Sequence, residues 1–237
     1  MIRRRNSTIE FTNINNQDVV IKKYHDTYNV EQEYHKIKNL SKFLNYSSTF
    51  RSVNVIEILE DKLILESLSG NCYGELSSIQ IDNLMNYTNE FIDLFLKCNK
   101  SDYSFDSDLS NLFFSQSNSQ FIFIDPIQEN LKINNLSFVV FSLSILKSMG
   151  KSKNILLFSK KITFFKDLLK KYVANGNLDS KKLKISFCKY INIIIDWNIK
   201  KTDKKKIFLR LFRIMILVPI WQMVKYYIKN LNINEKN

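Results

Sequence analysis

The stretch YSFDSDLSNLFFSQSNSQFIFIDP, residues 103–126, carries three aspartates and Asn111 beside a short apolar run. Asp106 and Asn111 are five residues apart, and Asp125 follows the strand-like FIFI. This spacing predicts a loop, a β-hairpin and a second loop, so that all three side chains lie at one end of the hairpin. Carboxylate and amide oxygens placed in this way are suited to hold Mg²⁺ on a phosphate. The competing interpretation is a set of solvated turn residues.

The length and composition of the chain are those of a globular protein. Its 237 residues can bury a sizeable core, and we expect two lobes. A content of 45% hydrophobic and 24% charged residues excludes a disordered chain.

The net charge of +12 and the isoelectric point near 9.4 indicate an anionic partner or a solvated basic surface. Basic residues gather at residues 3–5, at Lys181-Lys182 and at residues 204–206. No zinc-finger spacing or glycine-aromatic RNA-binding signature accompanies them, so no nucleic-acid partner is expected. A solvated basic surface is the first interpretation, and peripheral contact with a membrane is the second.

Cysteine content and hydropathy favour a cytoplasmic protein. Cys72, Cys98 and Cys188 are odd in number and widely spaced, which indicates neither disulfides nor a Cys-x-x-Cys metal site. The arginines near the N-terminus run into polar residues without the apolar core of a signal peptide. The longest charge-free run of the C-terminal region, residues 214–224, is too short to span a bilayer. We therefore expect the cytoplasm, with the inner face of the membrane as a further location.

The beginning of the chain predicts a β-hairpin. Residues 8–14 alternate apolar and polar side chains, and Asn15-Asn16 supplies a turn. Residues 19–21 form a β-branched strand that ends at Lys22.

The next segment predicts a helix and two strands. Helical spacing of apolar residues runs from residue 29 to about residue 45, with Glu33 beside the apolar face. Two strands, residues 53–59 and 63–66, follow and lead to a hinge at residues 67–70. The sheet of this part is expected to be small and antiparallel.

The rest of the chain is predicted to be helical except for residues 103–126. Apolar side chains recur at helical spacing from Ile81 to Phe95, which predicts one long helix before the acidic stretch. Further helices are expected after that stretch, separated by Gly150, by Asn175-Gly176-Asn177 and by a lysine-rich link. Their expected ranges are residues 136–149, 155–173, 181–197 and 205–230.

Four features follow one another along the chain: a strand ending in lysine, a helix with a glutamate, a strand leading to a hinge, and an Asp/Asn/Asp set. Together they resemble the protein-kinase-like fold, in particular the aminoglycoside-phosphotransferase-like branch of small-molecule kinases. The resemblance implies an α+β fold of two lobes. Residues 1–68 would form a small antiparallel β-sheet lobe with one helix, and residues 69–237 a mostly helical lobe that contains the catalytic-loop hairpin.

The lysine and the glutamate have counterparts in that superfamily. The strand Val19-Val20-Ile21-Lys22 is similar to the Val-Ala-Ile-Lys strand, which implies that Lys22 contacts the phosphates of ATP. Glu33 matches the helix glutamate that orients this lysine, with Glu31 as the alternative register.

The segment LILESLSG, residues 63–70, is similar to the Leu-x-Leu-Glu-x-x-x-Gly hinge of phosphotransferases. In that family the backbone of the hinge receives the adenine. The resemblance therefore implies that Glu66 and Leu68 bind the nucleotide.

The catalytic loop of the superfamily has the pattern His-x-Asp-x-x-x-x-Asn. Asp106 and Asn111 reproduce its spacing, with Ser104 in the place of the histidine. The resemblance implies that Asp106 accepts or orients the proton of a substrate hydroxyl, that Asn111 ligates Mg²⁺, and that Asp125 is the main metal ligand. Asp108 is the catalytic aspartate in the alternative register.

Two further segments resemble a narrower group, the kinase-like proteins encoded with capsule and surface-polysaccharide genes. Ile124-Asp125-Pro126 departs from Asp-Phe-Gly and looks like the variant found in that group. Residues 209–213, LRLFR, are similar to its last helix.

The function implied by the resemblance is transfer of the γ-phosphate of ATP, with Mg²⁺, to a hydroxyl of a small molecule. The acceptor would be a sugar or a surface-polysaccharide precursor. Whether the chain is an enzyme stays open, because no glycine precedes Gly70 and the catalytic loop lacks its histidine. The alternative is a pseudokinase that serves as a nucleotide-binding or partner-binding scaffold.

Overall fold

The computed structural model describes residues 2–3, 7–25, 30–68, 72–125, 131, 133–149, 152, 154–200 and 222–230. The chain divides into two compact units. The first unit comprises Met1–Tyr73 and Phe105–Glu129, and the second comprises Gly74–Ser104 and Asn130–Asn237. The first unit is an antiparallel sheet with one helix and a small second sheet, whereas the second unit is helical, so the expected α+β class is confirmed.

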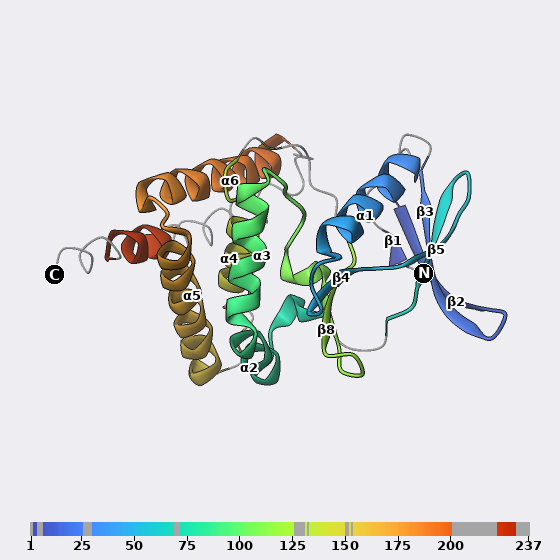
Figure 1. The fold of residues 1–237 in the computed structure, drawn as a ribbon, viewed down its shortest axis with the longest axis horizontal. Helices are drawn as coiled ribbons and strands as arrows, with labels where there is room; N and C mark the ends of the chain where they lie inside the picture. The colour runs from blue at the N-terminus through green and yellow to red at the C-terminus, as the bar shows by residue number, and fades with distance from the viewer. Residues whose placement is uncertain are drawn as a thin grey trace. The chain divides into compact units, whose positions relative to one another are not determined.

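The main sheet of the first unit has the strand order β1-β2-β3-β6-β5, and every neighbouring pair is antiparallel (Figure 1). Its strands are β1 (Ile2–Arg3), β2 (Ser7–Ile14), β3 (Gln17–Tyr24), β5 (Val55–Ile58) and β6 (Lys62–Glu66). Asn15 and Asn16 join β2 to β3 with φ angles of 51° and 62°. Two adjacent residues with positive φ form the tight turn that matches the twist of a hairpin, and asparagine tolerates this conformation well. The predicted hairpin is confirmed.

The single helix of this unit, α1 (Val30–Leu44), packs against strands of both sheets. Val30, Glu33, Ile37, Leu40 and Leu44 are its buried residues, and they recur every three or four positions, so they share one face. Four of the five are apolar and pack into the core. Glu33 places a carboxylate on that same face, where a charge needs a partner.

A second sheet joins the hairpin of the acidic stretch to the first unit. Strand β4 (Phe50–Ser52) pairs in parallel with β8 (Gln120–Phe123), which pairs antiparallel with β7 (Leu112–Ser115). The ring of Phe50 packs at 5.9 Å from Phe121 and 6.2 Å from Phe123, centroid to centroid. The hairpin expected in the helical lobe therefore lies in the same unit as the main sheet, while the boundary after residue 68 stays a prediction.

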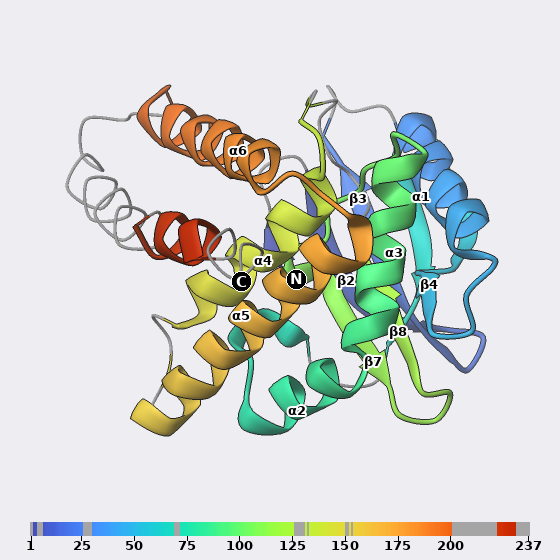
Figure 2. The ribbon, with the colours of Figure 1, turned by 60° about the vertical axis from the view of Figure 1, so that its left-hand side comes forward.

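The described part of the second unit is built from helices (Figure 2). The helices are α2 (Ser78–Asn86), α3 (Thr88–Lys100), α4 (Leu136–Met149), α5 (Ile155–Gly176), α6 (Ser180–Lys200) and a helical segment at residues 222–230. The three helices expected within residues 136–197 are confirmed. Of the helix expected at residues 205–230, only residues 222–230 are described, and residues 209–213 lie outside the described part of the chain.

The prediction of one long helix from Ile81 to Phe95 is wrong, because the chain leaves the helical conformation at Tyr87. Tyr87 ends α2 with φ −106° and ψ 21°. The hydroxyl of Thr88 donates to the carbonyl oxygens of Leu84 and Met85, at 3.3 and 2.7 Å, and so binds groups at the end of the first helix. Such local side-chain bonds compete with continuous helix, and hydrophobic spacing does not reveal them.

The core of the second unit is centred on α4, in which nearly every side chain is buried. Phe138 stacks on Tyr172 of α5 at 3.6 Å with an interplanar angle of 8°, and Phe141 stacks on Phe91 of α3 at 4.9 Å. Ser144 and Ser148 are buried too, and their hydroxyls donate back to carbonyl oxygens of α4 at 2.7 and 2.6 Å. The hydroxyls of Ser144 and Ser148 are therefore hydrogen-bonded within the helix itself, whereas the buried hydroxyl of Ser142 has no hydrogen-bond partner among the described residues.

Among the described helices, none combines the length and the apolar character needed to cross a bilayer.

We expect Phe138→Ala to lower the free energy of unfolding by about 3–5 kcal/mol, because it removes the ring that stacks on Tyr172 and leaves a cavity in the core. Urea unfolding followed by circular dichroism measures this change. Ile79→Ala is the matched control, because Ile79 is 80% exposed and its loss leaves no cavity. Equal effects of the two substitutions would contradict the assignment of α4 as the core helix.

Candidate functional site

Lys22 and Glu33 form a buried ion pair in the first unit. Lys22 lies on β3, and because side chains alternate along a strand it shares a face with Val20 and Tyr24. Lys22 is 8% exposed and Glu33 1% exposed, and Nζ of Lys22 donates to Oε1 of Glu33 at 2.5 Å. Two opposite charges at this depth are tolerated because each neutralises the other at hydrogen-bond distance.

Local structure on both elements favours this pair. Glu33 lies in the first turn of α1, where the partial positive charge of the helix N-terminus favours a carboxylate. The ring of Tyr24 lies 5.4 Å from Nζ of Lys22, close enough for a cation–π contact. Glu31, the alternative partner, is exposed, and the ion pair that the structure places on this helix is with Glu33.

Asp125 is the second carboxylate beside Lys22, with Oδ1 at 3.7 Å from Nζ. It follows β8, and the backbone on both sides of that strand end is tied down. The backbone amide of Ile124 donates to the backbone carbonyl oxygen of Asn111 at 3.0 Å. The backbone amide of Val53 donates to the backbone carbonyl oxygen of Phe123 at 2.9 Å. Strand pairing therefore brings a carboxylate from residue 125 to a lysine at residue 22.

The acidic loop before β7 is held by its own side chains. Oδ1 of Asp106 accepts the backbone amide of Asp108 at 3.0 Å. Oδ1 of Asp108 accepts both the amide and the hydroxyl of Ser110, each at 2.9 Å, and so caps the short 3-10 helix Leu109–Asn111. Asp108 has a structural role in this turn. The choice between Asp106 and Asp108 as a catalytic residue stays a prediction.

Asn111 lies at the junction of this loop and the hairpin and is 7% exposed. The backbone amide of Asn111 donates to the backbone carbonyl oxygen of Asp108 at 2.8 Å. The backbone carbonyl oxygen of Asn111 accepts from the backbone amide of Ile124, the neighbour of Asp125. Backbone pairing thus places Asn111 beside the end of β8. Its role as a metal ligand stays a prediction.

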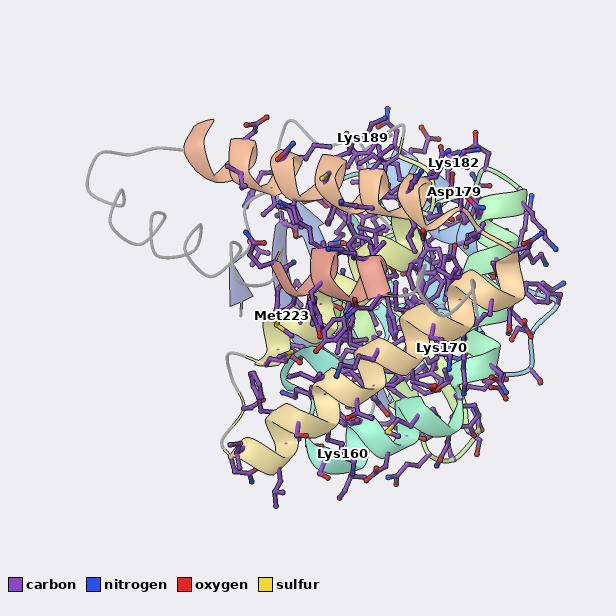
Figure 3. The ribbon with its side chains drawn as sticks, turned by 90° about the vertical axis from the view of Figure 1, so that its left-hand side faces the viewer. Lys160, Lys170, Asp179, Lys182, Lys189 and Met223 are labelled. Atoms are coloured by element: carbon purple, nitrogen blue, oxygen red, sulfur yellow. The ribbon has the colours of Figure 1, made fainter. Side chains whose placement is uncertain are left out.

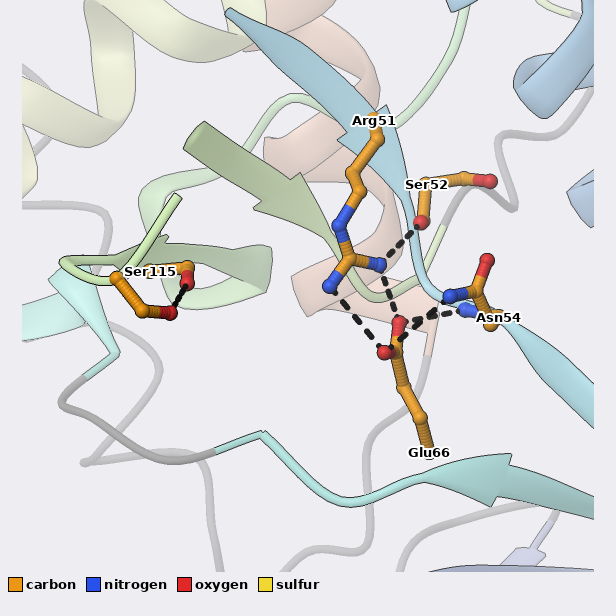
Figure 4. Close-up of polar contacts among 6 residues, drawn as sticks. Arg51, Ser52, Asn54, Glu66 and Ser115 are labelled. Carbon is orange, nitrogen blue, oxygen red and sulfur yellow. Dashed lines mark hydrogen bonds and ion pairs between the residues drawn. The ribbon is translucent and has the colours of Figure 1, made fainter. Parts of the chain in front are cut away.

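The carboxylate of Glu66, a residue expected to bind the nucleotide, contacts Arg51 and Asn54 (Figure 4). It binds the guanidinium of Arg51 through both oxygens and accepts the amide of Asn54 at 2.7 Å. Arg51 also donates to the carbonyl oxygen of Ser52 at 3.1 Å. These contacts join β6 to the segment that carries β4. The backbone amide of Glu66 also donates to the carbonyl oxygen of Asn54, at 3.1 Å, and the nucleotide-binding role of Glu66 stays a prediction.

The other predicted hinge residues are only partly within the described chain. Leu68 is half-buried and packs against the core cluster that includes Leu63, Leu65 and Ile122. Ser69 and Gly70 lie outside the described residues, as does Pro126. The nucleotide-binding role of Leu68 stays a prediction.

Sequence analysis did not find Arg51 or the contact of Tyr24 with Lys22. Arg51 lies two residues before the strand expected at residues 53–59, and its partner Glu66 is fifteen positions later. A single arginine carries no signal for such a distant partner. Tyr24 was detectable in principle, because it is two positions after Lys22 on a strand and must lie on the same face.

Burial raises the pKa of the Glu33 carboxyl above its ordinary value of 4.5, and the charge and hydrogen bond of Lys22 oppose this rise. The negative charge of Asp125 adds to the rise. The folded protein therefore binds the Glu33 proton more tightly than the unfolded chain does.

The oxygen donors near Lys22 suit a metal that arrives with a phosphate rather than a metal enclosed by protein ligands. Across the described ranges no three or more His, Cys, Asp or Glu side chains gather as a metal cage. Mg²⁺ in phosphate-transfer sites is commonly bound by one or two protein ligands together with phosphate and water oxygens. Asp125 and Asn111 carry oxygen donors of this kind, and their role as Mg²⁺ ligands stays a prediction.

Comparison with known proteins gives a likeness to solved structures. No protein-family model matches the chain, and no curated protein matches it either. Among solved structures it is similar to the pseudokinase domain of BIR2, an immune regulator of the RLK/Pelle family. The similarity has a TM-score of 0.41 with 11% sequence identity and covers 95% of this chain and 78% of that chain.

The raised pKa of Glu33 predicts a pH dependence of stability. A carboxyl with a raised pKa in the folded state stabilises the protein below its ordinary value of 4.5, and that contribution is lost as pH rises through the folded-state pKa. The unfolding free energy of the native protein minus that of Glu33→Gln should therefore fall as pH rises above 4.5. Urea unfolding of both proteins between about pH 4 and pH 8 measures it.

Glu31→Gln is the control for this experiment, because Glu31 is exposed on the same helix and its substitution should leave the pH profile unchanged. A difference between native protein and Glu33→Gln that rises with pH would contradict the prediction. It would mean that pairing with Lys22 outweighs burial and lowers the pKa.

Proposed function

We propose that this protein is a kinase-like phosphotransferase that binds ATP with Mg²⁺ and transfers the γ-phosphate to a hydroxyl of a small molecule. The observation that supports this proposal is the buried Lys22 held between the carboxylates of Glu33 and Asp125, at 2.5 and 3.7 Å. The stability of the fold does not require such an arrangement, because the attraction between a buried lysine and two carboxylates need not offset the free energy of removing these charges from water. A phosphate-binding site does require a fixed ammonium beside a metal-binding carboxylate.

Lys22 would hold the phosphates of the nucleotide. An ammonium group has three N–H donors, and the short bond to Glu33 uses one of them and fixes the direction of the others. Asp125 lies farther from Nζ than Glu33 does. In our proposal Glu33 remains the permanent partner, while phosphate oxygens take the remaining donors of Lys22 when the nucleotide binds.

Asp125 and Asn111 would hold Mg²⁺ on the phosphates. The metal supplies charge neutralisation of the phosphoryl oxygens. The protein's part is to keep a carboxylate and an amide at the end of a paired hairpin, where backbone hydrogen bonds limit their movement. Asp106 would orient the acceptor hydroxyl and accept its proton.

The acceptor in our proposal is a sugar or a surface-polysaccharide precursor, in keeping with the aminoglycoside-phosphotransferase-like branch. Its support is the resemblance of Ile124-Asp125-Pro126 to the variant in kinase-like proteins encoded with capsule and surface-polysaccharide genes. The protein would act in the cytoplasm, where ATP is available.

A second candidate is a pseudokinase that binds nucleotide or a partner protein without catalysis. The observation in its favour is the catalytic loop, where Ser104 stands in the place of histidine and the carboxylate of Asp106 accepts a backbone amide of its own turn. The chain also has no glycine before Gly70 to form a loop over the phosphates. Such a protein would keep the Lys22–Glu33 pair and lose phosphate transfer.

We expect Lys22→Met to weaken binding of ATP in the presence of Mg²⁺ at least about tenfold, because hydrogen bonds to charged groups contribute about 1.5–3 kcal/mol each. Isothermal titration calorimetry measures the Kd. Lys23→Met is the matched control, because Lys23 is the exposed neighbour on the same strand, paired with Asp61 at the surface. Binding unchanged in Lys22→Met, or weakened equally in both variants, would reject Lys22 as the phosphate ligand.

We expect Asp106→Asn to lower turnover of ATP by about 10²–10⁴-fold with little change in ATP affinity, because it removes the proton acceptor. Release of ADP in the presence of a panel of monosaccharides measures turnover. Asp108→Asn should retain activity, because Asn is also an effective helix cap, which tests the alternative register directly. If the native protein binds Mg²⁺-ATP without turning it over with any acceptor, the pseudokinase candidate replaces the enzyme.

A further inference from the structure

The exposed side of α5 changes character along its length. Leu156, Ser159, Thr163, Lys166 and Lys170 are exposed and spaced by three or four residues, so they form one stripe along the helix. The beginning of the stripe is aliphatic, since Leu156 is 78% exposed and its neighbour Ile155 81%. The later part is basic. A helix with apolar and lysine side chains on the same solvent-facing side is unusual for a surface that contacts only water.

Two neighbouring elements extend this surface. The ammonium of Lys166 lies 4.6 Å from the ring of Tyr227, which places residues 222–230 against α5. Burial raises the pKa of the Cys188 thiol, and Lys225 and Lys184 both oppose that rise, so α6 and residues 222–230 lie close together as well. Figure 3 shows α5, α6 and this segment on one side, with Lys170, Lys182 and Lys189 labelled.

We call this surface the lysine face and define it by Lys166 and Lys170 on α5, Lys184 on α6 and Lys225. Its charge is strongly unbalanced, because residues 163–196 and 222–230 contain nine lysines, three aspartates and no arginine or glutamate. Large apolar side chains lie among the lysines, since Ile185 is 53% exposed and Tyr226 61% exposed. The surface thus combines an excess of positive charge with exposed apolar groups.

We propose that the lysine face docks on an anionic lipid bilayer, with Ile155 and Leu156 entering the headgroup region. Clusters of four to eight basic residues bind anionic headgroups by charge, and apolar side chains beside them add binding by leaving water. In this attachment the helices lie along the membrane surface. The proposal does not depend on phosphate transfer.

Charge alone would also suit a nucleic acid, but the other features of the lysine face favour lipid. Every basic residue that the structure describes in this unit is lysine, whereas phosphate recognition on nucleic acids relies heavily on the planar, bidentate arginine. Aliphatic side chains such as Ile155 and Leu156 do not stack on bases in the way that aromatic rings do. An anionic bilayer accommodates both the charge and the aliphatic groups.

The test is cosedimentation of the full chain with vesicles of phosphatidylcholine alone or of phosphatidylcholine with phosphatidylserine. We expect binding only to the anionic vesicles, and weaker binding as salt is raised. Lys166→Glu with Lys170→Glu should lower the partition coefficient at least about tenfold, since each lysine near an anionic surface contributes roughly fivefold. Ile155→Ser with Leu156→Ser should also lower it, without changing the salt dependence.

The matched control is Lys38→Glu with Lys42→Glu on α1, because both are exposed and have the same spacing and the same change in net charge. Circular dichroism establishes that each variant is folded. Absence of binding by the native protein, or equal loss in the control and in the Lys166/Lys170 variant, would overturn the proposal. Tighter binding to a duplex or single-stranded oligonucleotide that is unaffected by Ile155→Ser with Leu156→Ser would overturn it too and assign the face to nucleic acid.

Discussion

The ion pair of Lys22 with Glu33 is the interaction on which the first unit depends. It requires β3 to pair with β6 so that Lys22 lies opposite Leu63, and it requires α1 to turn its apolar face toward the sheet. Removing one partner of a buried pair costs about 3–5 kcal/mol, because the remaining charge stays buried without compensation. A pair this deep therefore fixes how helix and sheet fit together within the unit, in addition to any role in binding phosphate.

A second ion pair connects this arrangement to the carboxylate that follows β8. Arg51 on β4 binds Glu66 at the end of β6, and β4 is the parallel neighbour of β8. The main sheet is therefore linked to the small sheet by a charge contact as well as by packing. The distance between Asp125 and Lys22 therefore depends on two strands. Strand β3 carries Lys22, and β4 pairs with β8, the strand that Asp125 follows.

Much of the first unit could be predicted from the sequence because its signals are local. The asparagine turn, the alternation along β2 and β3, and the spacing of α1 all depend on residues within a few positions of one another. Glu33 was identifiable as a carboxylate beside an apolar helix face. The missed features are non-local: the parallel pairing of β4 with β8 joins residues seventy-one positions apart, as in Phe50 with Phe121, and no periodicity encodes it. The break at Tyr87 was missed because it depends on a single hydroxyl rather than on hydrophobic spacing.

The two halves of the proposed site differ in what holds them in place, and this bears on whether the protein is an enzyme. Lys22 and Glu33 are fixed by the core, so substitutions there act on folding and on phosphate binding together. The loop of Asp106 and Asp108 is held by hydrogen bonds among residues 106–110 and by the thiol of Cys72, which donates to the carbonyl oxygen of Ser110 at 2.9 Å. None of these contacts involves the Lys22–Glu33 pair. A change in this loop, such as Ser104 in the place of the histidine of the resembled pattern, therefore need not disturb the Lys22–Glu33 pair. The same physics that makes the Lys22–Glu33 pair hard to replace makes it a poor indicator of catalysis, so the test of catalysis rests on the loop.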